Sequence, residues 1–117
     1  MANVQKTFAL IVGIVLGILG IWGLFVGTNN ILGFGVNYFQ TILHLIAGGF
    51  GIYVGTKGEG KGFNLSIGWI GLILGILGFI PGTDSLLASW FNINSAISWL
   101  HIVVGVVALI VAYTIKD

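Results

Sequence analysis

The sequence predicts an all-α integral membrane protein, a four-helix bundle built from two tandem transmembrane helical hairpins in one domain, residues 1–117. The first observation behind this prediction is composition: 57% of the 117 residues are hydrophobic, 6% are charged, and the mean hydropathy is +1.13. Soluble domains carry about 25% charged residues, and so short a chain cannot bury this much apolar surface within itself. The second observation is that the apolar residues fall into four segments of membrane-spanning length. We therefore expect membrane lipids to surround most of the chain.

The four segments are separated by connectors rich in turn-forming residues. The expected spans are about 7–26, 38–54, 64–80 and 95–113. Each is expected to be a helix, because a helix satisfies every backbone polar group internally and lipid offers no other partner. In the last connector, the run from Ser85 to Phe91 is expected to form a short turn of helix at the membrane interface.

The cations predict the orientation of the chain. In a four-span arrangement all of them lie on one side of the membrane, namely Lys6, Lys57, Lys61 and Lys116. The connectors on the other side contain no Lys or Arg. Cytoplasmic segments carry the excess of positive charge, so both termini and the middle connector are expected in the cytoplasm, with the protein in the cytoplasmic membrane.

The two halves of the sequence resemble each other. The run 17–20, Gly-Ile-Leu-Gly, recurs at 75–78 with an offset of 58. Asn37 and His44 recur as Asn94 and His101 with an offset of 57. We interpret this as an internal repeat, in which the halves share one topology about a pseudo-twofold axis along the membrane normal.

Glycines at helical spacing mark the first and third spans. On the offset of 58, Gly13, Gly17 and Gly20 correspond to Gly71, Gly75 and Gly78. Small residues four apart let helix backbones approach closely in lipid, so we expect these glycines to be packing positions. A glycine-lined pore is the alternative interpretation.

A polar stripe runs along the second and fourth spans. Its members recur at steps of three or four residues: Asn37, Thr41, His44 and Gly48 in one span, Asn94, Ser98, His101 and Gly105 in the other. Such steps place residues on one face of a helix. We expect this face to look into the bundle.

His44 and His101 are the only ionisable residues deep within any expected span. An ionisable residue in the membrane is a functional-site hypothesis by default. The favoured interpretation is a neutral pair that hydrogen-bonds to neighbouring helices and holds the repeats together, with no cofactor bound. One alternative is ligation of a haem or chlorophyll-type tetrapyrrole, for which Gly48 and Gly105 would leave room, and another is metal or proton handling. Two histidines without carboxylate or Cys make a poor site for a bare metal ion, so no metal site is expected.

Several function classes are excluded by what the sequence lacks. No Asp or Glu lies in an expected span, whereas proton-driven exporters need a carboxylate in the membrane. No catalytic motif is present, so we expect no catalytic residues and no enzymatic activity. A net charge of +1 is too small for a nucleic-acid partner.

The duplicated motif also carries a family resemblance. Val36-Asn37 followed by His44-Leu45 and Gly48, and Asn94 followed by Trp99-Leu100-His101 and Gly105, resemble the domain-of-unknown-function 4383 family. Its members are small bacterial and archaeal multi-pass membrane proteins. The resemblance implies four spans and two motif histidines, and it implies no activity.

Together these patterns favour a non-enzymatic structural or accessory membrane protein, which packs as a homo-oligomer or as a subunit of a larger membrane complex. Two alternatives stay open. One is a bis-His protein that binds haem or pigment for electron transfer or light harvesting, and the other is a small channel or carrier lined by the polar stripes.

Overall fold

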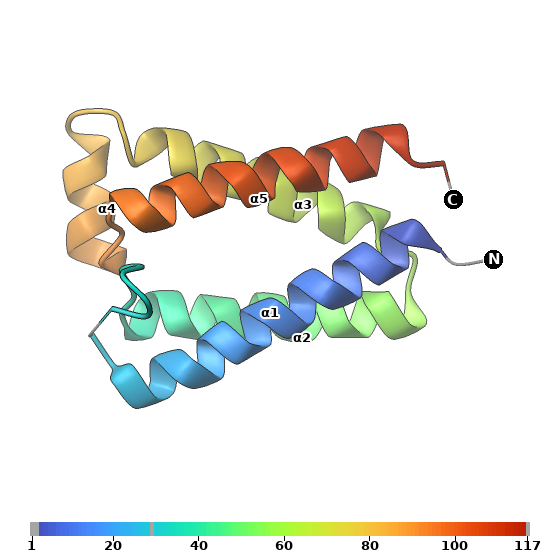
Figure 1. Ribbon diagram of the computed structural model, residues 1–117, viewed down its shortest axis with the longest axis horizontal. Helices are drawn as coiled ribbons and strands as arrows, with labels where there is room; N and C mark the ends of the chain where they lie inside the picture. The colour runs from blue at the N-terminus through green and yellow to red at the C-terminus, as the bar shows by residue number, and fades with distance from the viewer. Residues whose placement is uncertain (1–2, 29, 117) are drawn as a thin grey trace.

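The computed structural model describes residues 3–28 and 30–116. These residues form five helices: α1 (Val4–Val26), α2 (Tyr38–Lys57), α3 (Lys61–Leu77), α4 (Thr83–Phe91) and α5 (Ser95–Thr114). The all-α prediction is confirmed. The number of helices differs from the expected four, because the interfacial turn expected at 85–91 is a helix of nine residues, α4. It lies across one end of the molecule, opposite the two termini (Figure 1).

Three of the helices, α1, α2 and α5, are long and apolar enough to cross a membrane. This finding suggests a membrane location. The fourth apolar helix, α3, is shorter at 17 residues. At 1.5 Å per residue it is about 26 Å long, slightly less than the roughly 30 Å of a hydrocarbon core.

Helix α3 begins and ends three residues earlier than the expected span 64–80. It begins directly after Gly60, whose φ of 87° turns the chain sharply into the helix. It cannot continue to Ile80, because Pro81 disfavours helical geometry in the residue before it. Instead the hydroxyl of Thr83 donates to the carbonyl of Leu77 at 2.7 Å and satisfies a carbonyl at the end of the helix.

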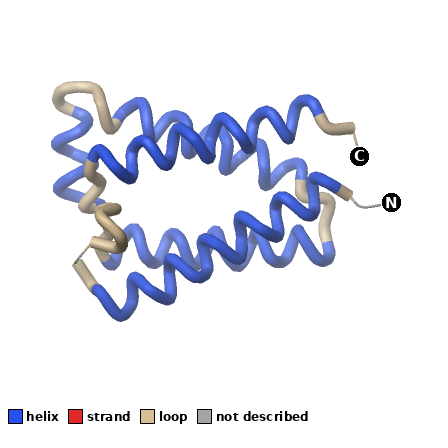
Figure 2. Tube along the Cα trace, in the orientation of Figure 1, coloured by secondary structure: helices blue, strands red, loops and turns tan. Residues whose placement is uncertain are grey.

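The helices pack as two antiparallel pairs, α1 with α2 and α3 with α5. Figure 2 shows the pairs side by side. The short loop between α2 and α3 connects them at the end of the termini, while α4 and the loop between α1 and α2 lie at the opposite end. Between the pairs contact is sparse, and no Cα of α2 lies within 8 Å of a Cα of α5. The molecule is therefore two tight pairs in looser contact.

Glycines bring the backbones together within each pair. A Cβ added at Gly13 would lie 2.5 Å from the backbone nitrogen of Ile52, and one at Gly75 would lie 2.8 Å from that of Ile102. The packing role predicted for these two glycines is confirmed. The backbone of Gly17 also packs against α2, since a Cβ added at Gly48 would lie 2.7 Å from its nitrogen, but a Cβ added at Gly17 itself would point away and meet nothing within 4 Å.

The contacts relate the two pairs by a different offset from the one expected. Gly20 faces Leu45 in the first pair, and Gly75 faces Ile102 in the second. Leu45 and Ile102 are 57 residues apart, as expected, but Gly20 and Gly75 are 55 apart rather than 58. The two Gly-Ile-Leu-Gly runs are therefore displaced by one helical turn in their contacts, which matches the three-residue displacement of α3.

Side-chain amides join the two pairs at the end that carries the termini. The amide nitrogen of Gln5 donates to the carbonyls of Val111 at 2.9 Å and Ile115 at 3.1 Å. Asn64 donates in turn to the backbone and side-chain oxygens of Gln5. Gln5 and Asn64 are both fully buried.

Amides also join the pairs at the opposite end. Gln40 donates to the carbonyls of Gly35 and Phe91, each at 2.9 Å. Three asparagines make further amide-to-carbonyl bonds there: Asn37 to Trp90 at 2.8 Å, Asn92 to Val36 at 2.7 Å, and Asn94 to Gly33 at 3.0 Å. The two pairs are thus fastened at both ends by polar contacts.

Candidate functional site

The two histidines occupy equivalent positions on α2 and α5. Each helix begins after an asparagine in extended backbone geometry, whose side chain accepts a hydrogen bond from the third residue on, 2.9 Å for Asn37 and 3.0 Å for Asn94. Such asparagine caps are among the most favourable helix starts. His44 and His101 each lie seven residues further, about 10 Å along the helix axis.

The neighbours of His44 fix the direction in which it points. Thr41 faces α1, because a Cβ added at Gly23 would collide with its side chain. Gln40 lies on an adjacent edge of α2 and donates to the carbonyl of Phe91 at the end of α4. His44 falls between these two edges on the helical wheel, so it points toward the space between α1 and the α3–α5 pair.

His101 has the matching environment on α5. Ser98 faces α3, because a Cβ added at Gly78 would collide with it. Ile97 lies on the adjacent edge in a buried cluster with Leu87 and Ile93. His101 falls between these edges in the same way, so the structure brings the two histidines to matching faces of the two pairs.

The imidazoles themselves lack partners on their inner edge. The Nδ1 atom of each ring is buried, and it neither donates nor accepts a hydrogen bond. Each residue as a whole is only partly buried. An unpaired polar atom in a buried setting costs about 1–3 kcal/mol, so this arrangement favours an additional partner for the histidines.

The rest of the polar stripe serves the packing of each pair. Asn37 and Asn94 cap their helices and bond across to the other pair. Thr41 and Ser98 are fully buried against α1 and α3, and their hydroxyl oxygens have no hydrogen-bond partner. Therefore only part of the polar stripe, which was predicted to point into the bundle, lies toward the space between the two pairs.

Gly48 and Gly105 do not leave the room expected for a ring. A Cβ at Gly48 would lie 2.7 Å from the backbone nitrogen of Gly17, and one at Gly105 would lie 2.5 Å from that of Leu72. The space beside each glycine is filled by the partner helix of its own pair. These two residues are packing positions in the structure.

The donor set at the histidines is small. Among residues 3–28 and 30–116, no three His, Cys, Asp or Glu side chains come together in a group that could hold a metal ion. A bare metal ion usually takes four or more protein ligands in a closed site, or three in an open one. Two imidazoles suit a metal only if it arrives with most of its ligands already in place.

A family model described as "Domain of unknown function (DUF4383)" matches residues 6–114. The chain belongs to this family. The match includes both asparagine caps and both histidines, and it confirms the resemblance carried by the duplicated motif. No curated protein and no solved structure matches the chain. The description of the DUF4383 family assigns no function to its members.

Proposed function

We propose that this chain is a non-enzymatic membrane protein that crosses the cytoplasmic membrane four times and acts as a structural or accessory component. On this proposal it packs against a second copy or against a larger membrane complex, and both of its termini are cytoplasmic. An internal duplication relates its two halves. The observation that carries the proposal is an apolar groove on the outer face of α2.

The proposed fourth crossing is supported by the pairing of α3 with α5. Contacts between these helices run from Gly68 against Leu109 to the C-cap Gly78 against Ser98, along the second half of α3. Because α5 is long enough to cross a membrane, its packing against α3 supports the proposal that α3 crosses beside it. The orientation is supported by the lysines: Lys57 ends α2 and Lys61 begins α3, at the end of the molecule where the termini lie.

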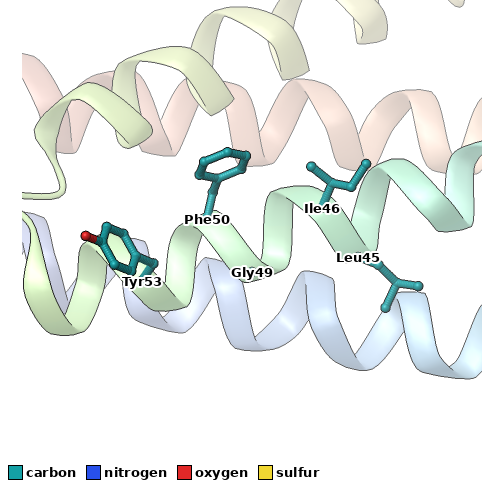
Figure 3. A pocket seen from close by; sticks show the side chains of 5 residues that line it. All are labelled: Leu45, Ile46, Gly49, Phe50 and Tyr53. Carbon is teal, nitrogen blue, oxygen red and sulfur yellow. The ribbon is translucent and has the colours of Figure 1, made fainter.

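The groove on α2 is lined by Leu45, Ile46, Gly49, Phe50 and Tyr53 and has a volume of about 470 Å³. Figure 3 shows Ile46 and Phe50 on one side of it, Leu45 directed toward α1, and Gly49 between them. Phe50 is 62% exposed, and a Cβ added at Gly49 would meet nothing within 4 Å. Gly49 is thus a small residue that the chain's own packing does not use.

Small residues on a lipid-facing surface allow another helix to approach closely, and this approach drives association in membranes. The large apolar side chains around Gly49 provide the contact area for such a helix. A groove of this kind therefore supports lateral association more directly than it supports transport or catalysis.

Cross-linking at the groove tests the proposal. The chain contains no cysteine, so Phe50→Cys introduces a single thiol for a short cross-linker in native membranes. We expect either a dimer at twice the 12.4 kDa chain mass or one discrete heavier adduct. Gly49→Leu should abolish this product by filling the groove.

The matched control is Gly62→Leu, because an added Cβ at Gly62 also meets nothing but lies at the start of α3, away from the groove. This variant should leave the cross-linked product unchanged. Two results would contradict the proposed association: recovery of monomer alone from native membranes, or a cross-linked product whose amount is unchanged by Gly49→Leu.

A further inference from the structure

We propose that Gln40, Thr41 and His44 of α2 bind one buried water molecule. The water donates hydrogen bonds to the Gln40 and His44 side chains and accepts one from the Thr41 hydroxyl. This inference concerns the interior of a single chain, so it goes beyond the proposed association and does not depend on it. It assigns a ligand to three polar atoms that the protein's own hydrogen bonds leave unpaired.

Three buried polar atoms without a partner among the described residues lie within about one turn of α2. They are Oε1 of Gln40, Oγ1 of Thr41 and Nδ1 of His44. Gln40 is 4% exposed and Thr41 is fully buried. Side chains three or four residues apart on a helix are neighbours, with Cβ atoms about 5–6 Å apart. His44 is therefore a neighbour of both Gln40 and Thr41, and the three unpaired atoms lie on one side of the helix.

The orientation of the Gln40 amide is fixed by its own bonds. Its Nε2 donates to the carbonyls of Gly35 and Phe91, each at 2.9 Å. Both N–H groups are thus used, and turning the amide over would cost both bonds. Oε1 is consequently held as a buried acceptor, and neither Thr41 nor His44 donates to it directly.

A water molecule satisfies all three atoms at once. Its two O–H groups serve Oε1 of Gln40 and Nδ1 of His44, and its oxygen accepts from the Thr41 hydroxyl, provided that neutral His44 carries its proton on Nε2. Buried waters make about three hydrogen bonds of this kind to otherwise unpaired groups. Two bonds of about 2.8 Å span at most about 5.6 Å, which suits side chains that are neighbours on a helix without direct contact.

The second half of the chain lacks the third partner. Ser98 and His101 stand at the equivalent positions of α5, and their Oγ and Nδ1 atoms are also buried and unpaired. The position equivalent to Gln40, however, is occupied by Ile97, which packs in an apolar cluster. Two partners hold a buried water less firmly than three, so we assign the site to the first half alone.

NMR of the purified protein in detergent, with histidine labelled by nitrogen-15, tests the site directly. The chain has two histidines, so a His101→Gln variant identifies the signals of His44. We expect His44 to be the Nε2–H tautomer and to show a nuclear Overhauser effect between its ring and a water of long residence time. An Nδ1–H tautomer at His44, or no contact with such a water, would overturn the inference. The same contact at His101 would overturn the restriction to the first half.

Thermal unfolding of Thr41→Val is an independent test, because valine has the shape of threonine without its hydroxyl. Removing a hydroxyl that holds a water should lower the unfolding temperature by more than about 3 °C, whereas removing an unpaired buried hydroxyl should raise it. Ser98→Ala is the matched control in the second half and should not lower this temperature. An unchanged or raised unfolding temperature for Thr41→Val, or an equal loss for Ser98→Ala, would contradict the assignment.

Discussion

The side-chain amide of Asn64 donates to both the backbone oxygen and the side-chain oxygen of Gln5, at 3.0 and 2.9 Å. Both residues are completely buried, and they lie 59 positions apart in the chain. Gln5 passes the connection on to the last turn of α5 through Val111 and Ile115. The side-chain amides of Gln5 and Asn64 thus connect α1, α3 and α5 at the end of the molecule where the termini lie.

Replacing Asn64 by Leu should destabilise this end of the molecule. The change leaves the side-chain oxygen of Gln5 buried without the donor it now has, and we expect a loss of about 1 kcal/mol of unfolding free energy. Thermal unfolding in detergent measures the effect. Thr56→Val is the control, because the Thr56 hydroxyl bonds only within its own helix, and it should leave the unfolding temperature unchanged. Equal stability of both variants would mean that the amide connection does not hold the pairs together.

The two glycines Gly17 and Gly75 should respond differently to alanine. A Cβ at Gly75 would lie 2.8 Å from backbone atoms of α5, so Gly75→Ala should overpack the α3–α5 contact and cost about 1–3 kcal/mol. A Cβ at Gly17 meets nothing, and Gly17→Ala should be neutral or stabilise the helix by up to about 1 kcal/mol. Unfolding in denaturing detergent compares the two. The same loss at both positions would show that Gly17 also points into its pair.

The displaced register of the second pair is open to a disulfide test. Cysteines at Ile102 and Gly75 should form a disulfide on mild oxidation, because these residues face each other and the loss of the Ile102 side chain removes the nearest side-chain contact. The backbone contact at 2.8 Å remains, so the helices must separate slightly and the variant should be less stable than the unmodified chain. Cysteines at Ile102 and Gly78 should not. The matching pair in the first half is Leu45 with Gly20. Preferential coupling of Ile102 with Gly78 would restore the register that the Gly-Ile-Leu-Gly runs predict.

Features set by neighbouring residues were predictable from the sequence. The helical class follows from apolar segment length, and α2 and α5 begin where expected because Asn37 and Asn94 provide the local capping chemistry. The equivalence of His44 and His101 also follows, since each lies a fixed number of residues from its cap within one helix.

Features set by distant residues were not predictable. Identical Gly-Ile-Leu-Gly runs do not determine which turn of α3 meets α5, because the start at Gly60 and the stop before Pro81 shift the whole helix. The side-chain direction at Gly17 depends on how α1 crosses α2. The Gln5–Asn64 connection joins the first turns of α1 and α3, 59 positions apart in the chain, and its only local signal was an amide beside each apolar run.

On the proposed topology the chain crosses the membrane four times with its lysine-bearing end in the cytoplasm, and labelling of single cysteines in intact cells measures this topology. Cysteines introduced at Asn30 and Ser85 lie in the connectors free of lysine, while one at Gly58 lies between Lys57 and Lys61. We expect a membrane-impermeant thiol reagent to label the first two from outside and to label Gly58→Cys only after the cells are permeabilised. Labelling of Gly58→Cys together with either of the others in intact cells would place both connectors on one side and contradict four crossings.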